Sequence, residues 1–313
     1  MHQTIRTIAA GMHFDGFYLL RSAAVRTSKT GKDYLDGTLA DRTGSIDFKV
    51  WDYSGTVRPD DVGKIIKVRA DAKEYQGTIQ LTVTQLRPAV PTDPYDIADL
   101  IPKAPIDENE AVLQVREFLA GMKDPDYRNL CETMLDRHLS DFKRIPAAKS
   151  VHHGFLCGLL MHTVYMMRAA AFYGDLYAEI IDRDLLVAGT FLHDLAKREE
   201  FLFSEFGMVT EYSVKGQLLG HLVMGAEDIA ETGKECGVPE EKLLLLRHMI
   251  LSHHGKPEFG AAVVPMTAEA ELLFHLDLID SRMEIYRETY ENMMPGTFSE
   301  KLFALEHRIY KRS

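Results

Sequence analysis

Five prolines between residues 88 and 105 divide the chain into two parts with different hydrophobic patterns. Before them, apolar and polar residues alternate over short runs, which is typical of half-buried β-strands. After them, apolar residues recur at the three- and four-residue spacing of amphipathic helices. Because proline-rich stretches commonly lie between folded units, the sequence predicts a first domain at residues 1–90, a linker at residues 91–107 and a second domain at residues 108–313.

The first part contains about five strand segments, separated by turn-forming stretches such as Thr43-Gly44-Ser45. The segments are Phe17–Leu20 with Ala23–Thr27, Tyr34–Leu39, Ile46–Trp51, Lys64–Ala70 and Ile79–Val83. Short strands at near-regular spacing favour a small closed barrel. The oligonucleotide-binding (OB) fold is the natural candidate of this size.

The second part has helical periodicity throughout. The helical segments are Glu108–Gly121, Pro125–Leu139, His152–Phe172, Asp182–Lys197, Val214–Gly233, Pro239–His254 and Thr267–Asn292. A strand pattern follows the prolines only at Val209–Tyr212, in a loop between two helices. The segment Phe298–Tyr310 packs either within the domain or against another subunit, so a homo-oligomer stays open. We expect a β-barrel followed by an all-α domain.

Composition excludes several classes of protein. The three cysteines lie far apart, which fits a reducing cytosol and excludes a disulfide framework or a thiolate zinc site. An apolar run of about 18 residues is absent, as is a signal peptide, so we expect a cytoplasmic protein without a membrane span. Residues 1–90 carry 13 Lys and Arg against 10 Asp and Glu, whereas residues 91–313 carry 23 against 37. The first part is therefore the better candidate for contact with a polyanion.

The pair His193-Asp194 directly follows the apolar run Asp184–Leu192. Buried polar groups cost several kcal/mol unless something pairs with them, so packing alone explains this pair poorly. A single histidine in a helical core is usually structural, but here each successive helix contributes one or two nitrogen or oxygen ligands. They are His162, His193, Asp194, His221, His253, His254 and Asp277. Imidazole and carboxylate without thiolate suit Mn, Fe, Zn, Co or Ni.

His162, His193-Asp194 and Asp277 reproduce the H…HD…D signature of HD-domain metal phosphohydrolases. The surrounding sequence is similar to the YhaM family of bacterial 3′-to-5′ exoribonucleases, in the stretches HHGFLCGLLMHTV, LLVAGTFLHDLAK, KGQLLGHLV, LSHHGKPEFG and PMTAEAELLFHLDLIDSRM. In that family an OB domain precedes the HD domain, and the segments TGKDYLDGTLADRTGSIDFKVWD and YQGTIQLTV resemble its barrel. The resemblance runs from about residue 14 to residue 290.

The resemblance implies roles for these residues. It assigns a first metal to His162, His193, Asp194 and Asp277, and a second to His221 and His253, with His254 as a further ligand. Asp280 is then an outer-shell or packing residue. The ions would be Mn²⁺ or Co²⁺, with Fe, Ni, Zn or Mg as alternatives, one or two per site. His193 and Asp194 would serve catalysis together with Lys197, which contacts phosphate in related phosphodiesterases; otherwise Lys197 is a solvated lysine at a helix C-terminus.

Aromatic and basic residues are candidates for binding a nucleic-acid strand. In the barrel, Tyr34, Trp51 and Tyr75 could stack on bases, as could Tyr18, although strand alternation must bury about half of the barrel's aromatic residues. A second candidate group lies near the start of a predicted helix, where phosphate binds readily; ordinary surface charge is the alternative. That group is Lys143, Arg144, Lys149 and His153.

Together these features predict a metal-dependent 3′-to-5′ exonuclease that acts on single-stranded RNA, with single-stranded DNA as a further substrate, and releases mononucleotides. A nucleotide or cyclic-nucleotide phosphohydrolase of the HD superfamily is one alternative. A single-strand-binding regulator with a structural HD site is another. The sequence does not decide between RNA and DNA, nor the identity and number of the ions.

Overall fold

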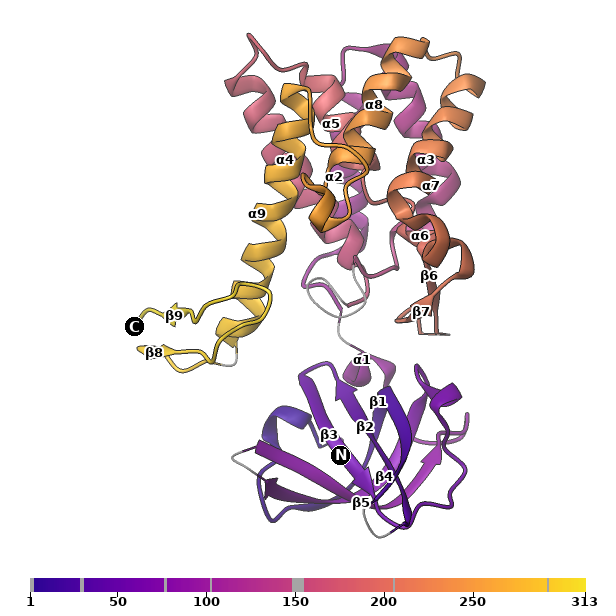
Figure 1. Cartoon of the computed structure of the whole chain (residues 1–313), viewed down its shortest axis with the longest axis vertical. Helices are drawn as coiled ribbons and strands as arrows, with labels where there is room; N and C mark the ends of the chain where they lie inside the picture. The colour runs from indigo at the N-terminus through magenta and orange to yellow at the C-terminus, as the bar shows by residue number, and fades with distance from the viewer. Residues whose placement is uncertain are drawn as a thin grey trace. The chain divides into compact units, whose positions relative to one another are not determined.

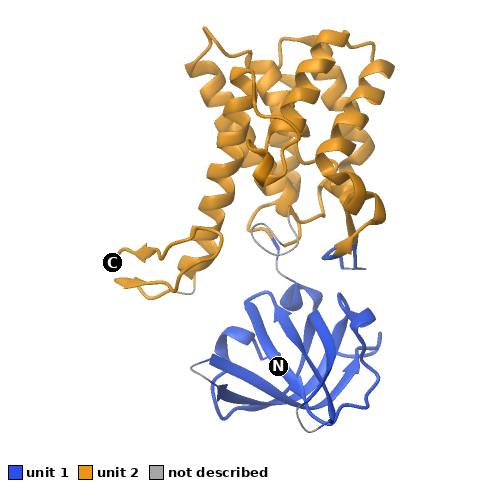
Figure 2. Cartoon of the chain, viewed as in Figure 1, with its two compact units in different colours: residues 1–103, 203–210 blue, residues 104–202, 211–313 orange. Residues whose placement is uncertain are grey.

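The computed structural model describes residues 3–28, 31–75, 78–101, 103–147, 155–204, 206–291 and 293–313. Contacts between Cα atoms divide the chain into two compact units, which Figure 2 shows in different colours. Unit 1 comprises residues 1–103 and 203–210, and unit 2 comprises residues 104–202 and 211–313. The first unit thus extends beyond residue 90, where the sequence places the end of the barrel domain.

Unit 1 is built on a closed five-stranded barrel (Figure 1). Its strands are β1 (His13–Thr27), β2 (Asp33–Asp41), β3 (Gly44–Val50), β4 (Ile65–Tyr75) and β5 (Thr78–Pro88). They are ordered β1-β2-β3-β5-β4, and β4 pairs with β1 to close the barrel. Only β3 and β5 run parallel. This is a small Greek-key barrel of the OB type, which confirms the predicted fold class.

Inward-facing residues of alternate positions fill the barrel, because successive side chains of a strand point to opposite faces. Leu20, Phe48 and Ile66 are completely buried in this core. Tyr18 is also completely buried, and its hydroxyl donates a hydrogen bond to the Gln3 carbonyl at 2.6 Å. The prediction that Tyr18 could stack on a base is therefore wrong, since Tyr18 shares the inward face of β1 with Leu20.

Much of the predicted linker packs on the barrel. The short helix α1 (Ile97–Leu100) contacts β1 and β2, and Leu100 is buried. The backbone N–H of Arg42 donates to the Asp99 carbonyl at 3.2 Å. Arg87, at the end of β5, donates to both carboxylate oxygens of Asp93 at 2.7 Å. These contacts explain why unit 1 continues to residue 103.

Unit 2 is helical. Its helices are α2 (Glu108–Ala120), α3 (Pro125–Phe142), α4 (Gly158–Leu176), α5 (Arg183–Leu192), α6 (Lys197–Glu200), α7 (Val214–Glu235), α8 (Glu240–Ser252) and α9 (Ala268–Glu291). Side-chain caps fix several of their starts: Asp182 accepts from the backbone N–H groups of Asp184 and Leu185, at 3.0 and 3.1 Å. No helix within the described ranges is long and apolar enough to cross a membrane.

Helix α5 lies at the centre of this unit. Every residue from Asp184 to Leu192 is buried, and α5 contacts α3, α4, α8 and α9. The predicted helix Asp182–Lys197 is in fact interrupted, because residues 193–196 form turns before α6 begins. His193 and Asp194 therefore lie in a buried turn that several helices surround.

Two short hairpins complete the chain. Strands β6 (Phe201–Phe203) and β7 (Val209–Tyr212) form the first, which confirms the strand predicted at Val209–Tyr212. Strands β8 (Thr297–Phe298) and β9 (Tyr310–Lys311) form the second, after α9.

Candidate metal centre

The first group of potential ligands comes from three separate elements. His162 lies in α4, His193 in the turn after α5, and Asp277 in α9, and one ligand atom of each lies within 4.8 Å of the others. The Nε2 atom of His162 is 3.2 Å from Nε2 of His193 and 3.4 Å from Oδ1 of Asp277. Three residues that span more than a hundred positions in the sequence are thus brought together.

A second group lies beside the first. It consists of His221 in α7 and the adjacent His253 and His254 just after α8, again with one ligand atom of each within 4.8 Å of the others. The rings of His221 and His253 have centroids 5.6 Å apart, and those of His221 and His254 are 5.2 Å apart. Imidazole nitrogens alone make up this group.

Asp194 faces both groups, with a different oxygen toward each. Its Oδ2 is 3.3 Å from Nε2 of His193 and 3.8 Å from Nε2 of His162. Its Oδ1 is 3.3 Å from Nε2 of His221 and 3.7 Å from Nε2 of His253. A single carboxylate in this position can bridge two cations, one on each side.

In four of these histidines, a hydrogen-bond acceptor lies beside the ring nitrogen Nδ1. The Nδ1 atoms of His193 and His253 lie 2.8 and 2.7 Å from the carbonyls of Thr190 and Ile250. Asp280 accepts from Nδ1 of His162 at 2.7 Å, and Glu200 from Nδ1 of His221 at 3.0 Å. Such partners place the proton on Nδ1 and leave Nε2 free to bind a metal. The placement of Asp280 is that of an outer-shell residue.

Glu200 is a functional candidate that the sequence prediction missed. Helix α7 is broken at Gly220, whose φ of 70° and ψ of 162° free the next backbone N–H from the helix. Oε1 of Glu200 accepts from this His221 N–H at 3.1 Å, in addition to the His221 ring. The glycine directly before His221 is the one sequence signal that points to this arrangement.

The electrostatics of the two groups differ. Burial alone would lower the pKa of His162, but hydrogen bonds to Asp277 and Asp280 outweigh it and raise the pKa to about 10. Burial and the neighbouring His193 and His254 instead hold the pKa of His253 well below its usual value. Without a metal, His162 carries a proton that an ion must displace, whereas His253 is a neutral ligand already.

Lys197 donates a hydrogen bond to Oδ2 of Asp194 at 2.6 Å. Burial would lower the pKa of Lys197, but the charge of Asp194 outweighs this and raises the pKa above its ordinary value. For Asp194, burial would raise the pKa, yet Lys197 and His193 hold it well below the usual range. Both groups are therefore charged, with the ammonium beside the shared carboxylate.

The donor set fits divalent metal ions. Oδ1 of Asp194, Nε2 of His221, Nε2 of His253 and Nδ1 of His254 are all buried without a hydrogen-bond partner. Buried polar atoms in this state are rare and costly, and a cation among them would satisfy all four. Gly260 (φ 97°) lies against this group, where an added Cβ would approach Nδ1 of His254 to 3.4 Å. Imidazole and carboxylate ligands suit first-row divalent ions.

On the barrel, the structure brings together two of the three predicted stacking residues. The rings of Tyr34 and Trp51 have centroids 5.0 Å apart, and the Lys49 ammonium lies 6.0 and 5.7 Å from their centres. Trp51 is 53% exposed. Tyr75, at the end of β4, is 60% exposed. It makes no ring contact with this pair among the described residues.

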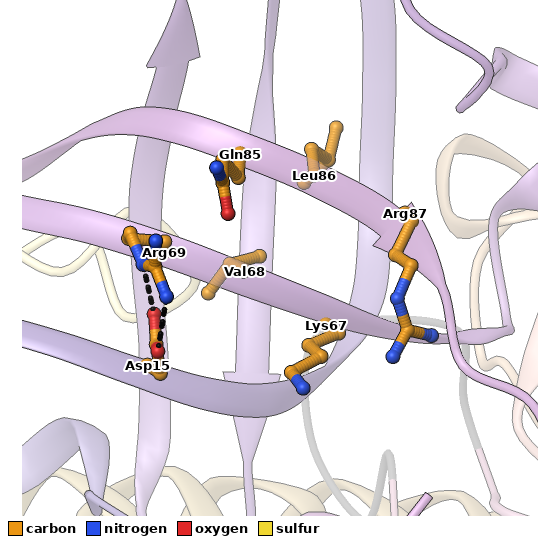
Figure 3. Close-up of a pocket in the computed structure, with 7 residues that line it drawn as sticks. All are labelled: Asp15, Lys67, Val68, Arg69, Gln85, Leu86 and Arg87. Atoms are coloured by element: carbon orange, nitrogen blue, oxygen red, sulfur yellow. Dashed lines mark hydrogen bonds and ion pairs between the residues drawn. The ribbon is translucent and has the colours of Figure 1, made fainter.

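A second surface of the barrel is less suited to phosphate than its basic residues suggest. Figure 3 shows a pocket between β1, β4 and β5, with Lys67, Arg69 and Arg87 along it. Arg69 binds Asp15 through two hydrogen bonds of 2.7 and 2.9 Å. Because Arg87 is paired with Asp93 in the same way, carboxylates already occupy both guanidinium groups.

The remaining predicted residues lie elsewhere. Lys143 follows α3, with its Nζ 3.5 Å from Oδ1 of Asn109, and Arg144 is next to it. Lys149 and His153 lie outside the described residues. His248 accepts a hydrogen bond from the Met266 N–H at 2.9 Å, and the exposed His275 pairs with Glu271. Neither of these two histidines reaches the two ligand groups.

A comparison with known protein families finds a match over the part of the chain that holds both ligand groups. Residues 159–282 match the HD domain family. The matched range includes every member of both ligand groups, together with Asp194, Lys197, Glu200 and Asp280. Members of the HD domain family are metal-dependent phosphohydrolases.

The barrel resembles solved OB domains. The second OB-fold domain of replication protein A from Methanococcus maripaludis is 17% identical, with a TM-score of 0.24, over 31% of this chain and 100% of that one. An OB domain from Methanosarcina mazei is 16% identical, with a TM-score of 0.25, over 31% and 87% of the two chains. A replication protein A heterotrimer bound to single-stranded DNA is 18% identical, with a TM-score of 0.22, over 28% and 66%. The assignment of the barrel rests on its strand order, not on these likenesses.

Proposed function

We propose that this protein is a metal-dependent 3′-to-5′ exonuclease that degrades single-stranded RNA, and single-stranded DNA as a further substrate, to mononucleotides. The observation that carries the hydrolytic part is the position of Asp194, which faces two groups of metal-type ligands with its two oxygens. A merely structural HD site would not need two adjacent sets of ligands, four of whose buried atoms lack a hydrogen-bond partner.

His162, His193, Asp194 and Asp277 would hold one ion, and His221, His253, His254 and Asp194 the other. Divalent ions in such a pair, when bound, activate water at neutral pH and stabilise charge on the phosphate oxygens. The protein's own residues hold the imidazoles in one tautomer, through Asp280, Glu200 and two backbone carbonyls. Lys197 supplies a fixed positive charge beside Asp194 for contact with a phosphate.

A single strand is the substrate that the domain combination supports best. OB barrels bind oligonucleotides, and stacking on aromatic rings is tolerant of sequence. The half-buried Tyr34 and the exposed Trp51 offer a stacking surface, and Lys49 beside them offers a cation for the backbone. The 3′-to-5′ direction and the preference for RNA are supported by the similarity of the sequence to the YhaM family.

The test is the digestion of single-stranded RNA and DNA of matched sequence in the presence of Mn²⁺, with the label at the 5′ end in one set and at the 3′ end in the other. We expect 5′-labelled strands to shorten progressively and 3′-labelled strands to release labelled mononucleotide at once. Labelled fragments of intermediate length from the 3′-labelled strands would contradict an exonuclease that starts at the 3′ end. Hydrolysis of nucleotides or cyclic nucleotides with both strands left intact would favour the nucleotide phosphohydrolase instead.

A further inference from the structure

The outer face of the first three barrel strands carries a pocket beside the Tyr34 and Trp51 rings. It has a volume of about 390 Å³ and is lined by residues of β1, β2 and β3, with one residue from β5. Lys49 belongs to both features, because its ammonium lies 5.7 Å from the centre of the Trp51 ring and its side chain lines the pocket. The ring pair and the pocket therefore lie on one continuous surface. We call this pocket the β1–β3 pocket.

Strand pairing arranges the outward side chains of this face in rows across the strands. Ser22 of β1 pairs with Thr38 of β2, and Thr38 pairs with Asp47 of β3. Successive side chains alternate between the two faces of a sheet, so the next outward row lies two residues along each strand. This second row is Ala24, Asp36 and Lys49. Polar groups on β2 and β3 thus surround a small side chain on β1, which leaves space for a ligand.

The hydroxyl protons of the first row are used within the row. Ser22 Oγ donates to Thr38 Oγ1 at 3.1 Å, and Thr38 Oγ1 donates to Asp47 Oδ1 at 3.0 Å. A carboxylate has about four acceptor positions, so Asp47 keeps most of its capacity for a ligand. The first row therefore offers acceptors to the pocket and no hydroxyl proton. A ligand that binds there has to bring hydrogen-bond donors of its own.

The charges that line the pocket balance one another. They are Arg26, Asp36, Asp47 and Lys49. Arg26 is already paired, since its Nε donates to Oδ1 of Asp36 at 2.9 Å. A phosphate in the pocket would face both carboxylates, and like charges repel. The β1–β3 pocket therefore suits an uncharged group that carries donors, which in a nucleic-acid strand is a base and not the backbone.

The close approach of β1 and β2 fixes the floor of the pocket. The register of β1 shifts between Leu20 and Ser22, and a Cβ added at Gly37 would meet the Ser22 carbonyl oxygen at 2.0 Å. Only glycine therefore fits at this point of β2. Because strands of a closed barrel present the polar groups, a ligand would order few of them on binding, which favours affinity.

We propose that the β1–β3 pocket binds a guanine base of the single strand, next to a base stacked on Tyr34 and Trp51. The Watson–Crick edge of guanine carries two adjacent donors, N1–H and the 2-amino group, which match the two oxygens of a carboxylate such as Asp47. Uracil presents one N–H between two carbonyl oxygens, and adenine and cytosine each carry a ring acceptor beside the amino group. Gln80, which also lines the pocket, offers an amide donor to guanine O6. The proposal rests on the strand binding proposed above and adds a preference for one base.

Inosine tests the proposal, because it is guanosine without the 2-amino group. Three labelled RNA strands of about 12 nucleotides, a length that an OB barrel can bind, carry guanosine, inosine or adenosine at every third position of an adenosine strand. Fluorescence anisotropy measures their affinities for the full chain in the presence of a chelator, which removes the ions that hydrolysis requires. We expect the guanosine strand to bind about tenfold more tightly than the inosine strand, since a hydrogen bond to a charged group discriminates by this order.

Asp47→Asn should bring the guanosine and inosine strands to equal affinity and leave the affinity for the adenosine strand unchanged. Because Asp47 is exposed, its replacement should also leave the circular dichroism melt unchanged. The matched control is Asp15→Asn, which removes the same charge from the pocket shown in Figure 3, between β1, β4 and β5. This control should keep the preference of the wild type for guanosine.

The outcomes separate the guanine site from strand binding. Equal affinity of the wild type for the guanosine and inosine strands would overturn the guanine site and leave strand binding in place. An Asp47→Asn variant that keeps the preference, or that binds all three strands equally more weakly, would overturn it as well. A wild type that binds none of the three strands would overturn strand binding itself, and the guanine site with it.

Discussion

Glu200 accepts hydrogen bonds from both the backbone N–H and the imidazole ring of His221, at 3.1 and 3.0 Å. The backbone donor is available only because α7 breaks at Gly220. One carboxylate thus fixes the position of His221 and its tautomer together. The second ligand group therefore depends on a residue outside the group.

Replacing Glu200 should therefore weaken the binding of one ion and leave the binding of the other unchanged. We expect Glu200→Gln to lower the affinity of the His221 group by about 10- to 100-fold, the usual effect of losing an outer-shell partner. Metal content after dialysis should fall from two ions per chain toward one. Glu199→Gln is the matched control, because Glu199 pairs with Lys215 at 2.8 Å instead of a ligand. Equal metal loss in both variants would remove the special role of Glu200.

Replacing Asp194, in contrast, should weaken the binding of both ions. Because its two oxygens face the two groups, Asp194→Asn should lose both ions and abolish hydrolysis, and His193→Ala should abolish hydrolysis as well. Asp277→Asn should chiefly affect the first group. Metal analysis combined with turnover of a small phosphodiester checks this, and circular dichroism confirms the fold. Full activity of Asp194→Asn with metal present would refute the site.

The ion of the first ligand group should release a proton as it binds. His162 has a pKa of about 10 in the metal-free protein, so near pH 7 it is charged and must lose its proton to become a ligand. The pKa of His253 lies well below its usual value, so the His253 imidazole is already neutral and loses no proton when it binds an ion. Titration calorimetry in two buffers of different ionisation enthalpy measures the released protons. Asp280→Asn should reduce the number of protons released, since Asp280 helps to hold the proton on His162.

The same pKa sets how the metal-free protein responds to alkali. The pKa of His162 is raised on folding from an ordinary value of 6.5 to about 10. Its contribution to stability is therefore complete below pH 6.5 and is lost as the pH rises toward 10. Thermal melts of chelator-treated protein should show this loss, and Asp280→Asn should diminish it. A melting temperature that stays constant across this window would contradict the assignment.

Substitutions on the barrel should weaken the binding of a single strand without changing the hydrolysis of a small substrate. Trp51→Ala and Tyr34→Ala should each weaken binding of a single strand by about 1–3 kcal/mol, the range for loss of one stacked base. The rate of hydrolysis of a small phosphodiester should not change, because such a substrate does not need the barrel in order to bind. Tyr95→Ala is a suitable control, since the Tyr95 ring contacts Phe17, with centroids 5.3 Å apart, and not the pair of Tyr34 and Trp51. Fluorescence anisotropy with a labelled oligonucleotide measures the difference.

The sequence predicted the elements well where hydrophobic period decides the structure. The five strands and the long helices follow from alternation and from three- and four-residue spacing. Even the short strand at Val209–Tyr212 was visible, because its residues alternate between two helical segments. Tyr18 was misjudged because alternation tells which residues share a face, not which face is inside. Only the packing of Tyr18 in the barrel core decides that.

The candidate site was predictable as a set of residues but not as an arrangement. Ordered histidines and aspartates on successive helices indicated His162, His193 and Asp277 as neighbours. That Asp194 faces two groups with two oxygens is a property of three-dimensional geometry alone. Glu200 was overlooked because a glutamate at the end of a charged helix usually faces solvent. Its hydrogen bond from the His221 N–H depends on the break at Gly220, on a different helix.

The closure of the barrel has a consequence for assembly. Since β4 pairs with β1, neither leaves a row of unpaired backbone donors and acceptors between them. Peptide partners could not join this barrel there by adding a strand, and two barrels could not fuse along such a seam. Self-association has to use side-chain surfaces elsewhere, and the outer wall of the barrel stays available to a ligand.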